Sequence, residues 1–350
     1  MSGSFPRNQW YVAAFASEIT HELLARTICG EPIVFYRTSG GEVVGLSDNC
    51  VHRRYPLSAG RLVDDKIVCG YHGFTYDQRG TCVYVPGQDR IPRTARVPRY
   101  PVVEQDTFIW VWIGDPDKAD ASRIPRTPWF EAEGWSTVRG MEHLEARYGL
   151  LVDNLMDLSH ETYLHSTSIG SAEVAETPIT TEVDDVNQVV YVSRRMDDAE
   201  CPPFYARATG ITGRITRWQD IEYHPPCMYQ LHTRIAPQGV YPPEDGPDDQ
   251  AFHVEIANPI TPETETTTHD FWVVARDFAI EDPEVSGKLT EITRSIILED
   301  VAALNRLERH LASEAGGYQE LSINIDTGGL AARRMLRRQI EEADLARAHL

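Results

Sequence analysis

The segment CVHRRYPLSAGRLVDDKIVCGYHGF, residues 50–74, places a cysteine and a histidine close together twice. His52 follows closely on Cys50, His72 follows closely on Cys69, and sixteen residues separate the two pairs. Thiolate sulfur and imidazole nitrogen bind both tetrahedral zinc and iron–sulfur clusters. Because the four ligands must meet at one centre, we expect two neighbouring loops, held between strands, that share a metal.

The division of ligands between the loops distinguishes the two kinds of metal centre. Zinc sites more often pair cysteine with cysteine and histidine with histidine. Here each loop supplies one of each, which favours a Rieske-type [2Fe–2S] cluster, where two cysteines hold one iron and two histidines the other. Gly70 and Gly73 flank His72, as expected where the backbone must approach a cluster.

A second group of candidate ligands lies in DNLMDLSHETYLHSTSIG, for which we predict a helix over 150–165. Asp157 and His160 share one helix face. His160 and His165 are separated by roughly 140° around an ideal helix. They can therefore meet at one metal only if the helix is widened, bent or ended between them.

Two histidines and one carboxylate form the facial triad that binds non-haem iron(II). A long helix predicted over 284–311 offers Glu299 and Asp300. Asp300 falls on the apolar stripe of Ile297 and Leu304, whereas Glu299 lies beside this stripe. An inward-facing carboxylate is costly unless it is paired or metal-bound. We therefore predict Asp300, rather than Glu299, as the third ligand of a mononuclear Fe(II).

Composition limits the partners and the compartment. The net charge of −20 argues against nucleic acid, whose phosphates would be repelled. There is no uninterrupted apolar run long enough for a transmembrane helix, and the first residues lack the apolar core of a signal peptide. The six scattered cysteines do not resemble a disulfide framework. We expect a cytoplasmic protein with reduced thiols and no membrane partner.

The pattern of elements predicts an α+β protein with two domains. PIVFYRTSGGEVVGL reads as a hairpin and TFIWVWIG as a buried strand, so we expect a small all-β domain over 1–118. A linker rich in proline and charge follows. For 119–350 we expect an α+β catalytic domain, with an antiparallel sheet and with helices that carry the mononuclear iron.

The two metal motifs resemble those of the Rieske non-haem iron oxygenases. The first has the form Cys-x-His, sixteen residues, Cys-x2-His, and the second Asp/Asn-x2-Asp-x2-His-x4-His. One departure follows His52, where RRYPL puts Arg54 and Tyr55 in places that the family usually fills with small residues. This difference leaves the ligands intact and changes a loop surface that could face a partner.

Flanking segments such as NQWYVAAF, ITPETETT and LSINIDTGGLAARR resemble the oxygenase components of vanillate O-demethylases. The resemblance implies that His160, His165 and Asp300 bind the mononuclear iron. It implies that Asp157 bridges this site to a Rieske histidine of the next subunit in a ring-shaped homotrimer, with Asn154 as a nearby polar support. The implied reaction is oxidative O-demethylation of a methoxylated aromatic acid, such as vanillate, to formaldehyde and a phenol.

The resemblance also implies a separate NADH-dependent reductase, which carries FMN and its own iron–sulfur cluster and supplies single electrons. This chain has no G-x-G-x-x-G fingerprint after a predicted strand, so we do not expect NADH to bind to it.

Three other functions compete with this interpretation. A related oxygenase could hydroxylate a ring or a methyl group of another aromatic acid or sulfonate, and product analysis would separate it from a demethylase. A Rieske electron carrier would need only the first domain, so the second metal motif weighs against it. A zinc-stapled interaction protein would be colourless.

Overall fold

The computed structural model describes residues 5–166, 168–314 and 320–348. The chain forms two compact units, one reaching to Arg126 and including Thr261–Glu265, the other made of Thr127–Ile260 and the residues from Thr266 onward. The expected boundary after residue 118 falls inside the first unit and stays a prediction. Nothing in the sequence indicated that residues 261–265 belong to the first unit.

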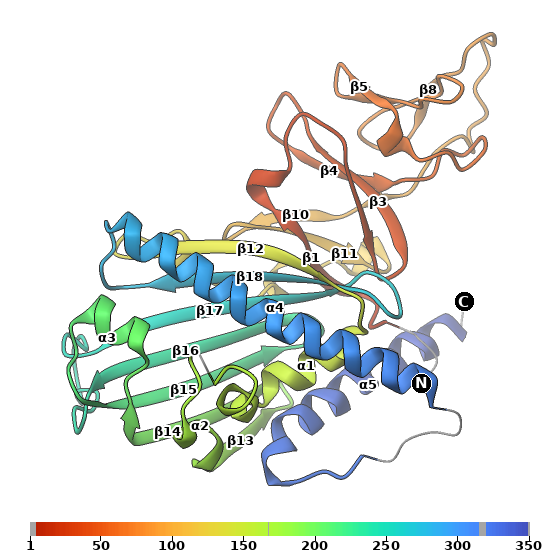
Figure 1. The fold of residues 1–350 in the computed structure, drawn as a ribbon. Helices are drawn as coiled ribbons and strands as arrows, with labels where there is room; N and C mark the ends of the chain where they lie inside the picture. The colour runs from red at the N-terminus through yellow and green to blue at the C-terminus, as the bar shows by residue number, and fades with distance from the viewer. Residues whose placement is uncertain (1–4, 167, 315–319, 349–350) are drawn as a thin grey trace. The chain divides into compact units, whose positions relative to one another are not determined.

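The first unit contains three small antiparallel sheets (Figure 1), with strand orders β1-β11-β10, β2-β3-β4-β9 and β5-β6-β7-β8. Strand β11 is buried at all six positions, which explains its uninterrupted apolar sequence. The strands are β1 (Gln9–Phe15), β2 (Leu24–Ile28), β3 (Glu31–Arg37), β4 (Val43–Ser47), β5 (Arg61–Val63), β6 (Lys66–Val68), β7 (Thr75–Tyr76), β8 (Cys82–Tyr84), β9 (Arg99–Tyr100), β10 (Val102–Gln105) and β11 (Phe108–Ile113).

Two loops of the first unit carry the first metal motif. Cys50 and His52 follow strand β4, and Cys69 and His72 lie in the turn between β6 and β7. The predicted hairpin is the antiparallel pair β3–β4. The sequence therefore placed the ligands correctly in loops between strands.

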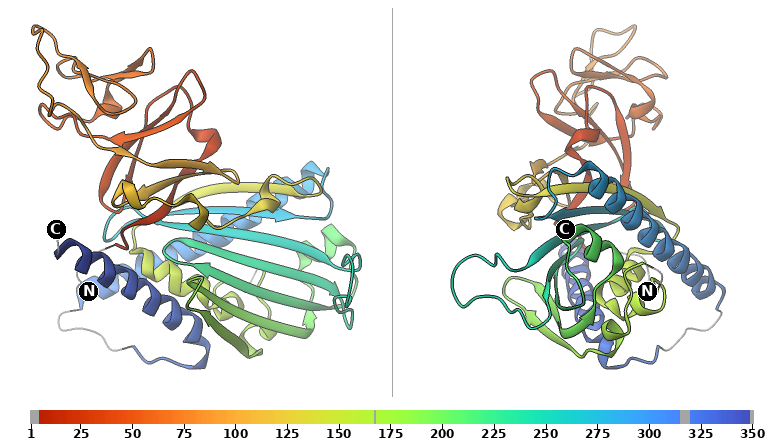
Figure 2. Two further views of the ribbon diagram at one scale, coloured as in Figure 1. Left: turned by 180° about the vertical axis from the view of Figure 1, so that it is seen from behind. Right: turned by 60° about the vertical axis from the view of Figure 1, so that its left-hand side comes forward.

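The second unit is built on a seven-stranded antiparallel sheet of order β12-β18-β17-β16-β15-β14-β13. Helix α4 lies across one face of this sheet in Figure 1 and behind the sheet in the reverse view (Figure 2, left). The strands are β12 (Ser136–Leu144), β13 (Ile179–Asp184), β14 (Val189–Glu200), β15 (Arg214–His224), β16 (Met228–Pro237), β17 (Phe252–Pro262) and β18 (Thr268–Arg276). The helices are α1 (Tyr148–Met156), α2 (Ala172–Glu176), α3 (Pro203–Thr209), α4 (Pro283–Ser313) and α5 (Thr327–Ala348).

Helix α4 begins where its sequence predicts. Asp282 caps it by accepting hydrogen bonds from the N–H groups of Glu284 and Val285, and Pro283 occupies the first turn. The helix buries Asp300 on the same face as Ile297 and packs into the core against the sheet and α1. The predicted inward position of Asp300 is therefore confirmed.

The continuous helix expected over 150–165 is wrong. Helix α1 ends at Met156, and a 3-10 turn, η6 (Leu158–Thr162), follows it. Asp157 stands at the break with an extended backbone, and its carboxylate caps η6 by accepting a hydrogen bond from the N–H of Ser159. This break allows His160 and His165 to converge, as the sequence required.

All six cysteines are free thiols. In the part of the chain that the structure describes, each helix is too short or too polar to span a bilayer.

Candidate metal centres and active site

The four ligands of the first motif are brought together with their sulfurs inside and their imidazoles outside. Cys50 and Cys69 are each only 2% exposed, whereas His52 and His72 are exposed and their ring centroids lie 4.5 Å apart. This arrangement fits a two-iron cluster with a buried thiolate end and a surface imidazole end.

Hydrogen-bond donors around the sulfurs support this fit. The hydroxyl oxygen of Tyr76 lies 3.1 Å from Sγ of Cys50. Burial raises the pKa of Cys69, while backbone N–H groups of Tyr71 and His72, which point at its sulfur, act in the opposite direction. N–H groups aimed at a buried sulfur stabilise the thiolate form that binds iron. A Cβ on Gly70 would approach the carbonyl oxygen of Ala59 to 2.7 Å, which explains the glycine.

The unusual residues after His52 shape the outer surface of this site. Arg54 is exposed and has a φ of 55°, a left-handed conformation that is strained for a non-glycine residue. Tyr55 packs on Tyr71 with ring centroids 5.4 Å apart, and Tyr71 in turn packs on His72 at 3.9 Å. The departure from the family pattern therefore adds Tyr55, whose ring packs on Tyr71, the aromatic residue that contacts the His72 imidazole.

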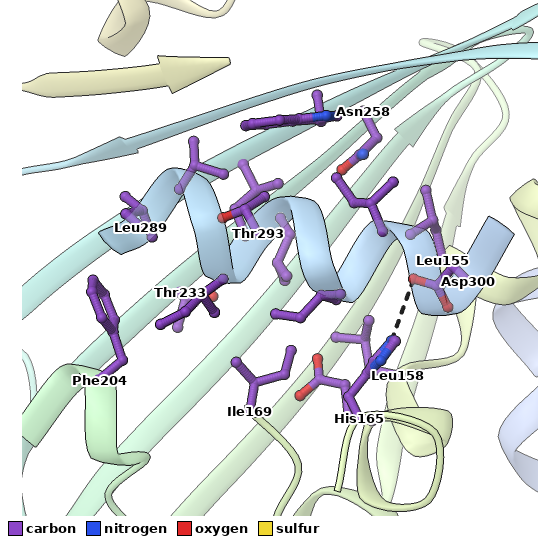
Figure 3. Close-up of a pocket in the computed structure, with 18 of the residues that line it drawn as sticks. Leu155, Leu158, His165, Ile169, Phe204, Thr233, Asn258, Leu289, Thr293 and Asp300 are labelled. Atoms are coloured by element: carbon purple, nitrogen blue, oxygen red, sulfur yellow. Dashed lines mark ion pairs between the residues drawn. The ribbon is translucent and has the colours of Figure 1, made fainter. Parts of the chain in front are cut away.

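The second site brings together His160, His165 and Asp300. One ligating atom from each lies within 4.8 Å of the others, and over the described ranges no other set of three or more such side chains is this close. Nε2 of His160 lies 3.6 Å from Oδ1 of Asp300. Nε2 of His165 lies 3.3 Å from Oδ2 of the same carboxylate, a pair that Figure 3 marks with a dashed line. Nε2 of His165 is buried and makes no hydrogen bond. Two imidazoles and a carboxylate with such an unsatisfied nitrogen fit a divalent metal of the facial-triad type.

Each histidine is oriented through its other nitrogen. Nδ1 of His160 lies 2.6 Å from the backbone carbonyl oxygen of Asp157, and Nδ1 of His165 lies 2.6 Å from Oε2 of Glu299. Fixing Nδ1 leaves Nε2 free for the metal. From the sequence we considered Glu299 only as an alternative to Asp300 for the third metal ligand. Its neighbouring position on α4 was the one signal that it could support the site.

Asn154 and Asp157 both lie beside this centre. Nδ2 of Asn154 donates a hydrogen bond of 3.1 Å to Oδ1 of Asp300. The contact expected between the Asp157 carboxylate and His160 is instead made by the Asp157 carbonyl, because the carboxylate turns back to cap η6. A bridge from Asp157 to a second subunit stays a prediction.

A cavity of about 120 Å³ borders the three ligands. It follows α4 from Leu289 to Asp300, a distance of roughly 16 Å at the usual helical rise. Figure 3 shows Leu289 and Phe204 at the end away from Asp300 and His165. The remaining apolar walls include Leu155, Leu158, Ile169, Leu231, Ile296 and Trp272. Its polar side chains, besides the three ligands, include Arg217 and Glu161, which we did not single out from the sequence.

Comparisons with known proteins agree with these two sites. Residues 9–101 match the Rieske [2Fe-2S] domain, and residues 144–342 match the vanillate O-demethylase oxygenase C-terminal domain. A vanillate O-demethylase oxygenase subunit from Pseudomonas sp. (strain HR199 / DSM 7063) is 37% identical, with 98% of each chain covered. The oxygenase component of dicamba O-demethylase from Stenotrophomonas maltophilia is 33% identical, over 97% of this chain and 100% of that protein.

Solved structures give the same result. Dicamba monooxygenase bound to 3,6-dichlorosalicylic acid superposes with a TM-score of 0.91 at 32% identity, covering 97% of this chain and 98% of the other. The structure of that enzyme with non-haem iron and dicamba superposes with a TM-score of 0.85, also at 32% identity, covering 99% and 100%.

A Rieske domain joined to a domain that presents two histidines and an aspartate to a cavity defines a Rieske non-haem iron oxygenase. This chain belongs to the family of vanillate O-demethylase oxygenase subunits. The resemblance, the α+β fold, the Rieske [2Fe–2S] cluster and the mononuclear iron predicted from the sequence are confirmed. An electron carrier would need only the first unit, and a zinc-stapled protein would not need the second site.

Proposed function

We propose that this chain is the oxygenase component of a monooxygenase that O-demethylates a methoxylated aromatic acid such as vanillate. The observation that carries the proposal is the placement of His160, His165 and Asp300 on the wall of a largely apolar cavity of about 120 Å³. A cavity of similar size, about 150 Å³, is known to bind benzene. The vanillate and dicamba O-demethylase relatives support the reaction type.

The metal groups would supply chemistry that side chains lack: the mononuclear iron would activate O2, and the cluster would deliver single electrons. His160, His165 and Asp300 would hold that iron on the wall of the cavity. Glu299 and the Asp157 carbonyl hold the two imidazoles in place, and Asn154 holds the Asp300 carboxylate. Cys50, His52, Cys69 and His72 would hold the cluster.

The apolar walls of the cavity would exclude water and seat the aromatic ring with its methoxy group toward the three ligands. Oxidation of the methoxy carbon by O2, two electrons and two protons from solvent yields a hemiacetal and water. The hemiacetal then collapses to formaldehyde and the phenol, with its hydroxyl proton passing to the phenolate oxygen through solvent.

We extend the proposal to the protein's partners. A separate NADH-dependent reductase with FMN and an iron–sulfur cluster would dock at the loop surface around Arg54, beside the exposed His52, and would leave His72 to face the next subunit. The protein would be a cytoplasmic homotrimer, in which Asp157 of one subunit passes electrons from His72 of the next. Residues 1–118 would form the electron-transfer domain and 119–350 the catalytic domain. The exposed imidazoles and the relatives named oxygenase subunits or components support this arrangement.

The proposal is tested with the purified iron-loaded protein, a Rieske-system reductase and NADH, against a panel of methoxybenzoates. We expect formaldehyde and the phenol in equal amounts, with vanillate among the best substrates. A diol or benzyl alcohol without formaldehyde would contradict demethylation. That result would favour the second candidate function, hydroxylation of another aromatic acid or sulfonate. A toluene-4-sulfonate monooxygenase subunit from Comamonas testosteroni supports this candidate. It is 34% identical over 88% of this chain and 89% of that protein.

A further inference from the structure

Arg217 is a buried cation on the wall of the active-site cavity. It lies on strand β15, its side chain is 4% exposed, and it borders the same cavity as His160 and Asp300. Arginine is rarely buried to this extent unless an anion pairs with it.

The partners of Arg217 within the protein satisfy only part of its guanidinium. Nη2 lies 3.5 Å from Oε2 of Glu161, whose other oxygen accepts a hydrogen bond of 3.1 Å from Nε2 of Gln219. Nε and Nη1 of Arg217 are buried and make no hydrogen bond. Leaving two buried donors unpaired is unfavourable, so these donors point to a ligand.

A second arginine with unpaired donors lies in the same cluster. Arg194 is a second buried guanidinium, 3% exposed, with Nε and Nη2 unpaired. Burial lowers the pKa of Arg194; Glu161 and Asp157 oppose this shift, and Arg217 adds to it. Two carboxylates, Glu161 and Asp157, therefore lie near the two guanidinium groups, yet four of the buried guanidinium nitrogens still lack a hydrogen-bond acceptor among the described residues.

We propose that Arg217 binds the anionic group of the aromatic substrate, a carboxylate or a sulfonate, and thereby sets the position of the ring in the cavity. This inference rests on the proposed function and names the group that the site recognises. The rigid, permanently charged guanidinium presents its unpaired Nε–H or Nη1–H to an oxyanion in a fixed direction, which gives a charge-assisted hydrogen bond.

Glu161 acts as a positioning residue in this arrangement. It directly follows His160 in the chain, and its Oε2 lies 3.5 Å from Nη2 of Arg217. The anion-binding group is therefore tied to the segment that carries a metal ligand. A fixed spacing between the anion and the metal would select which ring position faces the three ligands.

The test compares vanillate with its uncharged amide, vanillamide, by anaerobic titration calorimetry on the iron-loaded protein and by formaldehyde release. The wild type should favour vanillate by 100-fold or more, because a site built for one polar group rejects a substrate that lacks it. Arg217→Gln should weaken vanillate binding by on the order of 100-fold, change vanillamide little and so abolish the preference. Arg195→Gln, at an arginine on the neighbouring strand β14 whose side chain is 41% exposed and paired with Asp220, is the matched control.

Arg217→Lys keeps the positive charge opposite Glu161 but loses the planar guanidinium, so it should show an intermediate loss of the preference for vanillate. If Arg217→Gln does not fold, Arg217→Lys tests the inference in its place. A titration with 4-hydroxy-3-methoxybenzenesulfonate tells the carboxylate from the sulfonate, and tight binding of either supports the inference. Wild-type affinity and wild-type preference in both Arg217 variants would overturn it. If the wild type binds benzoates but releases no formaldehyde, the proposed function fails, while the calorimetry still tests Arg217.

Discussion

The two metal sites of this chain are assembled from different kinds of segment. The first site takes its ligands from two short loops close together in the sequence, with Cys50 and Cys69 buried and their partner histidines at the surface. The second joins His160 and His165, on and just after η6, to Asp300 on α4, and encloses them beside a cavity. A site that exchanges electrons needs an exposed edge, whereas a site that handles O2 and substrate needs enclosure.

The largest effect should come from Cys69→Ser, which removes a buried ligand of the first site. We expect the red-brown colour and the acid-labile sulfide to be lost and turnover to stop, because two cysteines must hold one iron. The wild-type cluster should have a reduction potential of roughly −150 to +300 mV. Visible spectroscopy and sulfide analysis measure the loss. The second site should still take up one metal per chain, and loss of both metals would show that the sites are not independent.

Asp300→Ala should empty the second metal site and leave the first site intact. Turnover should be abolished and the mononuclear metal lost, because two histidines alone remain, while the Rieske spectrum stays unchanged. Metal analysis and electron paramagnetic resonance on the same sample separate the two centres. Retention of the mononuclear metal at wild-type affinity would show that Asp300 is not a ligand.

The difference between the sites also explains what the sequence could predict. The first site could be read directly, because its spacing lies within one segment. Asp300 could be chosen because helical periodicity placed it on the buried face of α4. Contacts between segments far apart in the sequence could not be predicted, since Arg217 on β15 meets Glu161 on η6 only through the register of the β-sheet and the break after α1. The capping role of the Asp157 carboxylate was hidden for a similar reason, because a helix was expected to continue through it.

Asp157→Asn should separate electron delivery from metal binding. Asparagine caps helices about as well as aspartate, and the contact to His160 comes from the backbone carbonyl, so folding and metal content should be retained. If the carboxylate bridges to the next subunit, product formation should fall by orders of magnitude while the cluster is still reduced. Single-turnover reoxidation of the pre-reduced cluster with substrate and O2 is the measurement. Wild-type reoxidation coupled to product would rule out the bridge.

The smallest effect should come from Glu299→Gln, which probes the support of the second site rather than a ligand. Oε2 of Glu299 accepts from Nδ1 of His165, so a neutral amide keeps the shape and weakens the orienting hydrogen bond. Loss of such a partner typically reduces metal affinity or activity by about 10- to 100-fold. Competition with a chelator measures the iron affinity, and Glu291→Gln, at a glutamate on the same helix that is 72% exposed and pairs with Lys288, is the control. A site emptied by Glu299→Gln but filled in Asp300→Ala would make Glu299 the ligand and would reverse the roles of these two neighbouring carboxylates.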